Sequence, residues 1–167
     1  MIKISGKYVN LRNVSVSDAE FILSLRCDDK KSRFLHKTEN DIEKQRQYIK
    51  SKENVKDEWY FIIENKNNVP IGTYRIYDLR PDSFCIGSWL MIDGVSPQEM
   101  LEADFLVRNF GFDTLGMNKM HFDVRKENKK VWTYHKLVGA KQVGETELDY
   151  LFECDKQDFL NGIKRFL

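Results

Sequence analysis

Polar and apolar residues follow two different periods in the first third of the chain. Tyr8 to Arg12 alternates residue by residue, as half-buried strands do. Behind it, Phe21, Ile22 and Leu25 recur at helical spacing after serine and carboxylate side chains that can cap a helix. A second helix is predicted from Thr38 to Ser51, with Thr38 and Asp41 as start signals. This region is therefore expected to form one strand followed by two helices.

The middle of the chain is rich in β-branched and aromatic residues, which strands favour. Two turn-forming segments, residues 67–70 and 80–82, divide it into three apolar stretches. The pattern predicts an antiparallel three-strand meander over Glu58 to Glu64, Ile71 to Leu79 and Ser83 to Ile92.

The apolar period becomes helical again after Ser96. This serine is followed by a proline in the first turn and by Glu99 three residues on, which is the pattern of a capping box. Gly116 stands where a left-handed helix stop is expected. We therefore expect the longest helix to begin here, with an apolar face made of Met100, Ala103, Val107 and Phe110.

The last part of the chain is expected to add two strands and two helices. The strands are predicted over Met120 to Val124 and Leu148 to Cys154, and the helices over Asn128 to Leu137 and Asp155 to Phe166. No linker, repeat or low-complexity tract interrupts this order. The expected fold class is α+β, with a single domain over residues 1–167.

Composition and charge narrow the classes of protein to which this chain can belong. Of 167 residues, 41% are hydrophobic, and 27 Lys and Arg against 26 Asp and Glu give a net charge of +1. Such a chain can bury a hydrophobic core. Its nearly balanced charge creates no broad positive electrostatic field that would attract nucleic acid or an anionic membrane surface. Neither an export signal nor an apolar run long enough to span a bilayer is predicted. Cys27, Cys85 and Cys154 lack disulfide or metal-ligand spacing, which favours a reducing, cytoplasmic compartment and no metal.

Two long segments carry a resemblance to a known family. They are IGSWLMI at 86–92 with the stretch up to Glu145, and GKYVNLRNVSVSDAEFILSLR at 6–26 with FLHKT at 34–38. The order and spacing of DVRKENKKVWTYHKLVGAKQVGE at 123–145 are the most specific part. The chain resembles the GCN5-related N-acetyltransferases (GNAT), in particular the branch with ribosomal-protein and amino-sugar acetyltransferases. The resemblance implies a mixed, mostly antiparallel sheet flanked by helices and splayed between the fourth and fifth predicted strands.

The resemblance also implies acetyl-CoA as co-substrate. Backbone groups of Leu90, Met91 and Ile92 are expected to receive the pantetheine, and Gly87 either allows a bulge that opens the sheet or relieves packing beside Trp89. The pyrophosphate of CoA is expected at the start of the helix after Pro97, because the backbone amides at a helix N-terminus favour anions.

The phosphate loop departs from the family's Q/R-x-x-G-x-G/A pattern. Residues 95–100 stand in its place, where Pro97 removes a backbone donor and Glu99 brings a negative charge. Either CoA binds in another register with help from the side chains of Ser96 and Gln98, or CoA binding is poor.

Tyr134 matches the family tyrosine that protonates the departing thiolate, a transfer that phenol and thiol pKa values near 10 and about 8.5 allow. Its alternative role is that of a core tyrosine. Asn128 is expected either to bind the pantetheine or to cap its helix. Lys130, with Lys126 and Lys129, either contacts the 3'-phosphate of CoA or is solvated.

The sequence offers several candidates for the base that deprotonates the amine. The position where relatives carry a glutamate is Cys85 here, which is no ready substitute. His36 is the preferred candidate, because the segment 33–37 is expected to cover the acceptor side. The other candidates are Asp93, His121 and Asp123, whereas His135 is expected to be structural or exposed.

The expected function is that of an acetyl-CoA-dependent N-acetyltransferase acting on a small amine, with an amino sugar or nucleotide-linked amino sugar as the favoured acceptor. A protein or peptide N-acetyltransferase and a non-catalytic acyl-CoA-binding domain are the alternatives. No nucleic acid or membrane partner is expected, and the sequence leaves open a homodimer. Aromatic and cationic residues of the meander either contact a nucleotide or form part of the core; they are Trp59, Tyr74, Arg75, Tyr77 and Arg80.

Overall fold

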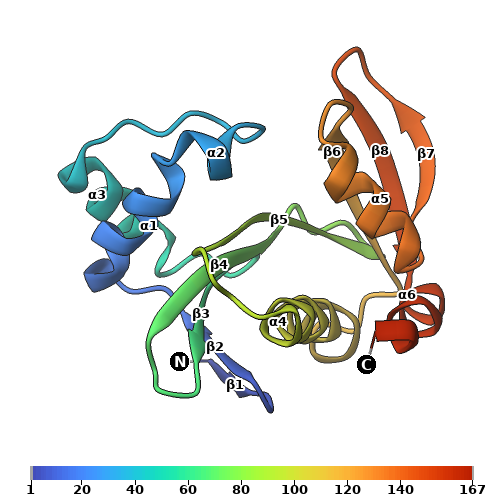
Figure 1. Cartoon of the computed structure of the whole chain (residues 1–167), viewed down its shortest axis with the longest axis horizontal. Helices are drawn as coiled ribbons and strands as arrows, with labels where there is room; N and C mark the ends of the chain where they lie inside the picture. The colour runs from blue at the N-terminus through green and yellow to red at the C-terminus, as the bar shows by residue number, and fades with distance from the viewer. Residues whose placement is uncertain (1, 167) are drawn as a thin grey trace. The chain divides into compact units, whose positions relative to one another are not determined.

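The computed structural model describes residues 2–166, which form two compact units. Unit 1 comprises residues 2–76 and 87–107, and unit 2 comprises residues 77–86 and 108–166. Eight strands, paired mostly antiparallel, and helices make up a mixed α+β fold (Figure 1). The α+β prediction is confirmed.

Unit 1 is built on a run of neighbouring strands. These are β1 (Lys3–Ser5), β2 (Val9–Asn13), β3 (Trp59–Asn65), β4 (Pro70–Tyr77) and the later part of β5 (Ser83–Met91), hydrogen-bonded in that order. β1, β2, β3 and β4 pair antiparallel in turn, which gives the predicted meander its first two strands.

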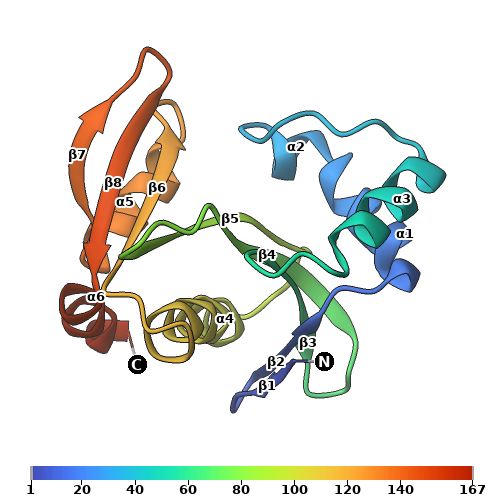
Figure 2. The ribbon, with the colours of Figure 1, turned by 180° about the vertical axis from the view of Figure 1, so that it is seen from behind.

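Two helices bury apolar side chains on this sheet. After the short 3-10 turn Val16–Asp18, α1 (Ala19–Arg26) and α3 (Ile42–Lys52) lie side by side in both views (Figures 1 and 2). Their apolar faces meet β3 in one cluster of buried residues, made of Ala19, Ile22, Ile49, Tyr60 and Ile62. The helical spacing found in the sequence therefore marks the core-facing side of these helices.

The start of α3 differs from the prediction. The helix begins at Ile42 rather than at Thr38, because the Asp41 carboxylate accepts hydrogen bonds from the backbone of Glu43 and Lys44 and so acts as the cap. The Thr38 hydroxyl is instead bonded to Arg26.

The long helix α4 (Pro97–Asn109) begins with the predicted capping box. The Ser96 hydroxyl accepts from the Glu99 amide at 3.1 Å, and the Glu99 carboxylate accepts from the Ser96 amide at 3.1 Å. The helix ends at Asn109 and continues as a π-helical turn, Phe110–Thr114, ahead of Gly116 at φ 72°. The stop at Gly116 is thus confirmed, but the last turn has a different hydrogen-bond pattern from that expected.

Unit 2 holds the other strands around β6 (Lys119–Arg125). β6 pairs in parallel with the start of β5 over three residue pairs, from Ser83–Lys119 to Cys85–His121. On its other side β6 pairs antiparallel with β8 (Asp149–Asp155), which pairs antiparallel with β7 (Lys141–Glu145). α5 (Lys129–Leu137) packs on this sheet, with the ring of Phe122 4.5 Å from that of His135 (Figure 2). The chain closes with α6 (Lys156–Ile163) and a 3-10 turn, Lys164–Phe166, so the predicted closing helix is shorter than expected.

Three short elements are absent from the predictions. They are β1, α2 (Asp29–Ser32) and β7. Each has three to five residues and an exposed or mixed burial pattern, so no periodic apolar signal marks it.

Candidate active site

The backbone irregularity of β5 lies at Ser88, one residue after the predicted Gly87. Ser88 has a φ of 53°, a left-handed conformation that is uncommon for a residue with a side chain. Its carbonyl accepts from the Thr73 hydroxyl at 2.9 Å within the core of unit 1. A left-handed residue inside a strand is typical of a bulge, so we assign the irregularity of β5 to Ser88 rather than to Gly87.

The predicted pantetheine-binding residues follow this bulge. Leu90 is buried, Met91 is half-buried and Ile92 is exposed. The Ile92 amide donates to the Ile71 carbonyl at 2.9 Å, so this amide is engaged within the sheet. A side chain at Gly72 would meet the Leu90 carbonyl at 2.6 Å, which explains why glycine stands there.

The first turn of α4 already holds a carboxylate. The amides of Ser96 and Glu99 are bound within the capping box, and the Met100 amide donates to the Ser96 carbonyl. Gln98 is exposed and Pro97 has no donor. The Glu99 carboxylate therefore lies at the positive end of the helix dipole, where the pyrophosphate is expected.

Arg26, at the end of α1, connects the segment of His36 to the bulge. Its guanidinium donates to the Thr38 hydroxyl at 2.7 Å, to the His36 carbonyl at 3.4 Å and to the Ser88 hydroxyl at 3.4 Å. His36 itself is exposed. Sequence reasoning missed Arg26, because its partners lie 10 to 62 residues away and no local motif marks it.

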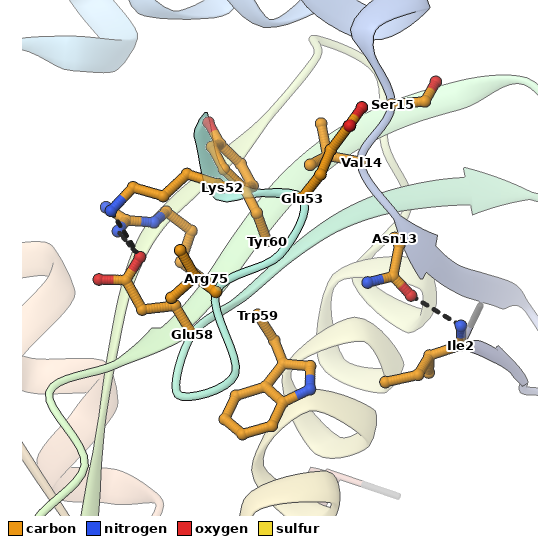
Figure 3. Close-up of a pocket in the computed structure, with 11 residues that line it drawn as sticks. Ile2, Asn13, Val14, Ser15, Lys52, Glu53, Glu58, Trp59, Tyr60 and Arg75 are labelled. Carbon is orange, nitrogen blue, oxygen red and sulfur yellow. Dashed lines mark hydrogen bonds and ion pairs between the residues drawn. The ribbon is translucent and has the colours of Figure 1, made fainter. Parts of the chain in front are cut away.

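A pocket of about 480 Å³ opens in unit 1 beside the end of α3 (Figure 3). Lys52 and Arg75 converge there on Glu58, at 2.7 Å and 3.8 Å. Trp59 lies on another side of the pocket, and the buried phenol of Tyr60 has its pKa raised by desolvation. The pocket thus combines two cations with aromatic rings.

Two of the meander residues that were expected to contact a nucleotide, Tyr74 and Arg80, do not line this pocket. Tyr74 is buried in unit 1, where its hydroxyl donates to Asp104 at 2.6 Å and its ring stacks on Trp89 at 5.0 Å. It is a core residue. Arg80 is exposed in unit 2 and pairs with Asp78 at 3.2 Å.

The remaining predicted cofactor residues lie on or at the start of α5 in unit 2. Asn128 is the N-cap residue of α5 and its carbonyl accepts from the amides of Val131 and Trp132, but its side chain makes no capping hydrogen bond. Lys130 is exposed and Tyr134 is half-buried. The next residue, His135, is buried and lies 2.9 Å from the Arg108 guanidinium, which confirms its structural role.

The other candidate bases differ in burial and charge. Asp93 is exposed, and its ion pair with Lys31 lowers its pKa. Burial raises the pKa of the Cys85 thiol to about 11, so the thiol is neutral near pH 7. Asp123 is exposed, whereas His121 is buried between two polar side chains.

Two negative findings apply to residues 2–166. No group of three or more His, Cys, Asp or Glu side chains there is arranged to hold a metal ion. None of the helices described in this range is both long and apolar enough to cross a membrane.

Comparison with known proteins gives the family. The model of the acetyltransferase (GNAT) domain matches residues 9–141. The solved structure of apo FdhC, a nucleotide-linked sugar GNAT, is 34% identical, covers 99% of this chain and 96% of its own, and has a TM-score of 0.86. No curated protein matches the chain significantly. The chain belongs to the GNAT acetyltransferase family.

More distant structures share the fold. A GNAT acetyltransferase from Bacillus anthracis is 14% identical over 93% of this chain and 99% of its own, with a TM-score of 0.78. Spermidine N-acetyltransferase SpeG from Vibrio cholerae is 15% identical over 93% of this chain and 98% of its own, with a TM-score of 0.75.

Proposed function

We propose that this protein transfers the acetyl group of acetyl-CoA to the amine of a nucleotide-linked amino sugar. One observation carries the proposal: the chain is 34% identical over 99% of its length to FdhC, a nucleotide-linked sugar GNAT. In this reaction the amine nitrogen attacks the thioester carbonyl carbon, the carbon–sulfur bond breaks, and the thiolate leaves with a proton. The reaction therefore needs two proton transfers, one from the amine to a base and one from an acid to the sulfur.

On the donor side, the proposal assigns backbone groups of Leu90, Met91 and Ile92 to the pantetheine and the thioester carbonyl. Ser96 and Gln98 are assigned to the pyrophosphate. The Ser96 hydroxyl accepts from Glu99, and its own proton stays available to a phosphate oxygen. In unit 2, Asn128 is assigned to the pantetheine and Lys130 to the 3'-phosphate. The absence of a side-chain cap at Asn128 supports its role as a ligand.

Tyr134 is assigned as the general acid. A phenol, whose pKa is near 10 in model compounds, can donate to a thiolate whose thiol has a pKa near 8.5. His36 stays the unit 1 candidate for the base, with an exposed ring on the segment that Arg26 holds.

On the acceptor side, the pocket of unit 1 supports a nucleotide-linked substrate. A diphosphate carries the charge that Lys52 and Arg75 attract, and the indole of Trp59 offers a surface for a base. Glu58 pairs with both cations and offsets one of their two charges, so a diphosphate competes with this carboxylate for Lys52 and Arg75. The amino sugar is the small part of such a molecule, so most of the binding comes from the nucleotide.

The proposal includes one N-acetyltransferase domain made of both units, because the family model takes residues from each. It also includes a cytoplasmic location, supported by three free cysteines.

The test has two stages. Acetyl-CoA at one hundred times its dissociation constant stabilises a binding protein by about 2.7 kcal/mol, which raises the melting temperature. Release of the CoA thiol is then followed with a nucleotide-linked amino sugar, a free amino sugar, spermidine and a peptide amine. The proposal expects the first of these to react fastest. Preference for the peptide favours a protein N-acetyltransferase, and binding without release favours a non-catalytic acyl-CoA-binding domain.

A further inference from the structure

Asn13, the last residue of β2, lines the pocket of unit 1 with one half of its side-chain amide already bound. Its Oδ1 accepts from the backbone amide of Ile2 at 2.7 Å. In return, the backbone amide of Asn13 donates to the Ile2 carbonyl at 3.3 Å. Every residue that lines this pocket belongs to unit 1, so the site is complete within one unit.

The bond to Ile2 determines which end of the Asn13 side chain faces the pocket. A backbone N–H group only donates, so the atom that it meets is the amide oxygen, and Nδ2 takes the other position. Figure 3 shows Nδ2 on the side away from Ile2, toward the interior of the pocket. Within residues 2–166 no hydrogen bond engages this nitrogen. Asn13 therefore presents donors, and no acceptor, to a molecule in the pocket.

Neighbouring groups hold Asn13 in place. The guanidinium of Arg12 donates to the Asn13 carbonyl at 3.1 Å and to the Asp18 carboxylate at 2.8 Å. On the next strand, Phe61 is the partner of Asn13 in the β2–β3 register. A polar group that is held by packing and hydrogen bonds before a ligand arrives loses little freedom on binding, so it discriminates well between ligands.

The ring of Trp59 lies on the same face of the sheet as the side chain of Asn13. Trp59 precedes Phe61 by two residues on β3, and side chains alternate along a strand, so both point to the face of Asn13. Diagonal neighbours on adjacent antiparallel strands are about 7–8 Å apart, within reach of an aromatic ring. A base that stacks on the indole can therefore turn its edge toward Asn13.

The two cations of the pocket lie across from Asn13 (Figure 3). They are Lys52 and Arg75, with Glu58 between them, and the proposed function places the diphosphate there. In a pyrimidine nucleotide the sugar is attached to ring position 1, and position 4 lies opposite it in the ring. A nucleotide with its diphosphate at the cations therefore directs position 4 toward Asn13.

Nucleobases differ in the group at this distant edge. Uracil and thymine carry a carbonyl at position 4, where cytosine carries an amino group, and guanine and adenine differ in the same way at position 6. A carbonyl oxygen accepts from Nδ2 of Asn13, whereas an amino group meets it donor against donor. An asparagine can also bind adenine with its oxygen and nitrogen together, but the oxygen of Asn13 is bound to Ile2.

We propose that Asn13 selects a keto base, namely uracil, thymine or guanine, in the nucleotide-linked acceptor. Its Nδ2 donates to the carbonyl oxygen at the edge of the base directed away from the sugar. This inference rests on the proposed function and deepens it. Asn13 determines specificity by binding the nucleotide and does not touch the reacting amine.

The test uses free nucleoside diphosphates and isothermal titration calorimetry, so it needs neither acetyl-CoA nor turnover. UDP and CDP are the matched pair, because their bases differ at position 4. We expect the wild type to bind UDP about three- to tenfold more tightly than CDP, the effect of one neutral hydrogen bond. GDP should bind more tightly than ADP by a similar factor.

Asn13→Asp reverses the group that faces the base. One carboxylate oxygen can still accept from the Ile2 amide, and the other presents an acceptor where Nδ2 stood. The added charge weakens every diphosphate, so the readout is the ratio of the two affinities, which should now favour CDP over UDP. The control is Asn65→Asp, because the Asn65 side-chain oxygen also accepts from backbone amides and lies outside the pocket. It should keep the wild-type ratio.

Three results overturn the selection by Asn13. They are equal affinities of the wild type for UDP and CDP, an unchanged ratio in Asn13→Asp, and no binding of any of the four diphosphates. If Asn13→Asp does not fold, the two matched pairs of nucleotides decide the question on the wild type.

Failure of the proposed function gives a different result. A protein that prefers UDP to CDP but releases no CoA thiol with any amine keeps the base selection and refutes the acetyl transfer. A protein that releases thiol with a nucleotide-linked amino sugar but binds UDP and CDP equally keeps the transfer and refutes the selection.

Discussion

Ser96 and Glu99 exchange two hydrogen bonds of 3.1 Å at the first turn of α4. Each side chain accepts from the backbone amide of the other, so two amides at the helix start are satisfied inside the protein. In this chain, the Glu99 carboxylate lies at the positive end of the helix dipole, where the proposed function places the pyrophosphate.

Replacing Glu99 by glutamine removes the charge and keeps an oxygen that can accept from the Ser96 amide. We expect the free energy of unfolding to change by less than about 0.5 kcal/mol, whereas Ser96→Ala, which removes the cap, should cost about 1 kcal/mol. CoA affinity of Glu99→Gln should be equal or higher, because repulsion of the pyrophosphate is lost. A titration of the melting shift with CoA measures this, and a marked fall in affinity would contradict the register assigned to the whole loop.

Tyr134→Phe removes the phenolic oxygen and keeps the ring. If Tyr134 protonates the thiolate, kcat should fall by about 10²- to 10⁴-fold with little change in CoA affinity. Steady-state kinetics and the CoA melting shift separate the two effects. Unchanged turnover would make Tyr134 a packing residue of α5.

The ion pair of Arg12 and Asp18 predicts a pH-dependent stability. Asp18 is buried, which raises its pKa, but hydrogen bonds from Arg12 at 2.8 Å and from Ser15, together with the Arg12 charge, lower it by more. A lowered pKa stabilises the fold above the ordinary aspartate pKa of about 3.9, and this contribution is lost as the pH falls through the pKa of the folded state.

Asp18→Asn should therefore cost about 3 kcal/mol at pH 7, because Arg12 loses a buried partner. The difference between wild type and variant should shrink in acid. Urea unfolding at neutral and acidic pH measures it. Arg12 also pairs with Glu64 at 3.1 Å, so Glu64→Gln serves as a second variant on the same guanidinium. A difference that stays constant with pH would show that Asp18 contributes by packing alone.

The pocket of unit 1 gives a prediction on the acceptor. Arg75→Gln should raise KM for the nucleotide-linked amino sugar by about tenfold or more, the effect of one charge-assisted hydrogen bond, with little change in kcat. Glu58→Gln should lower this KM, because it removes the carboxylate that competes with the diphosphate for Lys52 and Arg75. The free amino sugar is the control substrate, and its KM should not respond. Equal effects on both substrates would place the nucleotide elsewhere.

Local patterns predicted the elements well where a single periodic face or cap determines them. The helix start at Ser96 and the stop at Gly116 follow from side chains within three residues or from one backbone conformation. The predicted start at Thr38 was wrong: the Thr38 hydroxyl is bonded to Arg26, twelve residues away in the sequence, and the Asp41 carboxylate caps the helix instead.

Contacts between distant residues explain most of what sequence reasoning missed at the site. Tyr74 is a core residue, and its hydroxyl donates a hydrogen bond to Asp104, thirty residues later in the sequence. His121 was one of several candidate bases, and only the fold brings Ser83 and Asp78, 38 and 43 residues away, to its two nitrogens. The roles proposed for Tyr134 and Asn128 come from the family resemblance, because the pattern of charged and apolar residues does not indicate them.

The most direct test is amine-dependent release of the CoA thiol from acetyl-CoA, followed with a nucleotide-linked amino sugar and with the same sugar without its nucleotide. The account predicts release only when both acetyl-CoA and an amine are present, one acetylated product per thiol by mass spectrometry, and a higher kcat/KM for the nucleotide-linked acceptor. A protein that binds acetyl-CoA but releases no thiol with either acceptor, or that prefers the sugar without its nucleotide, would contradict it.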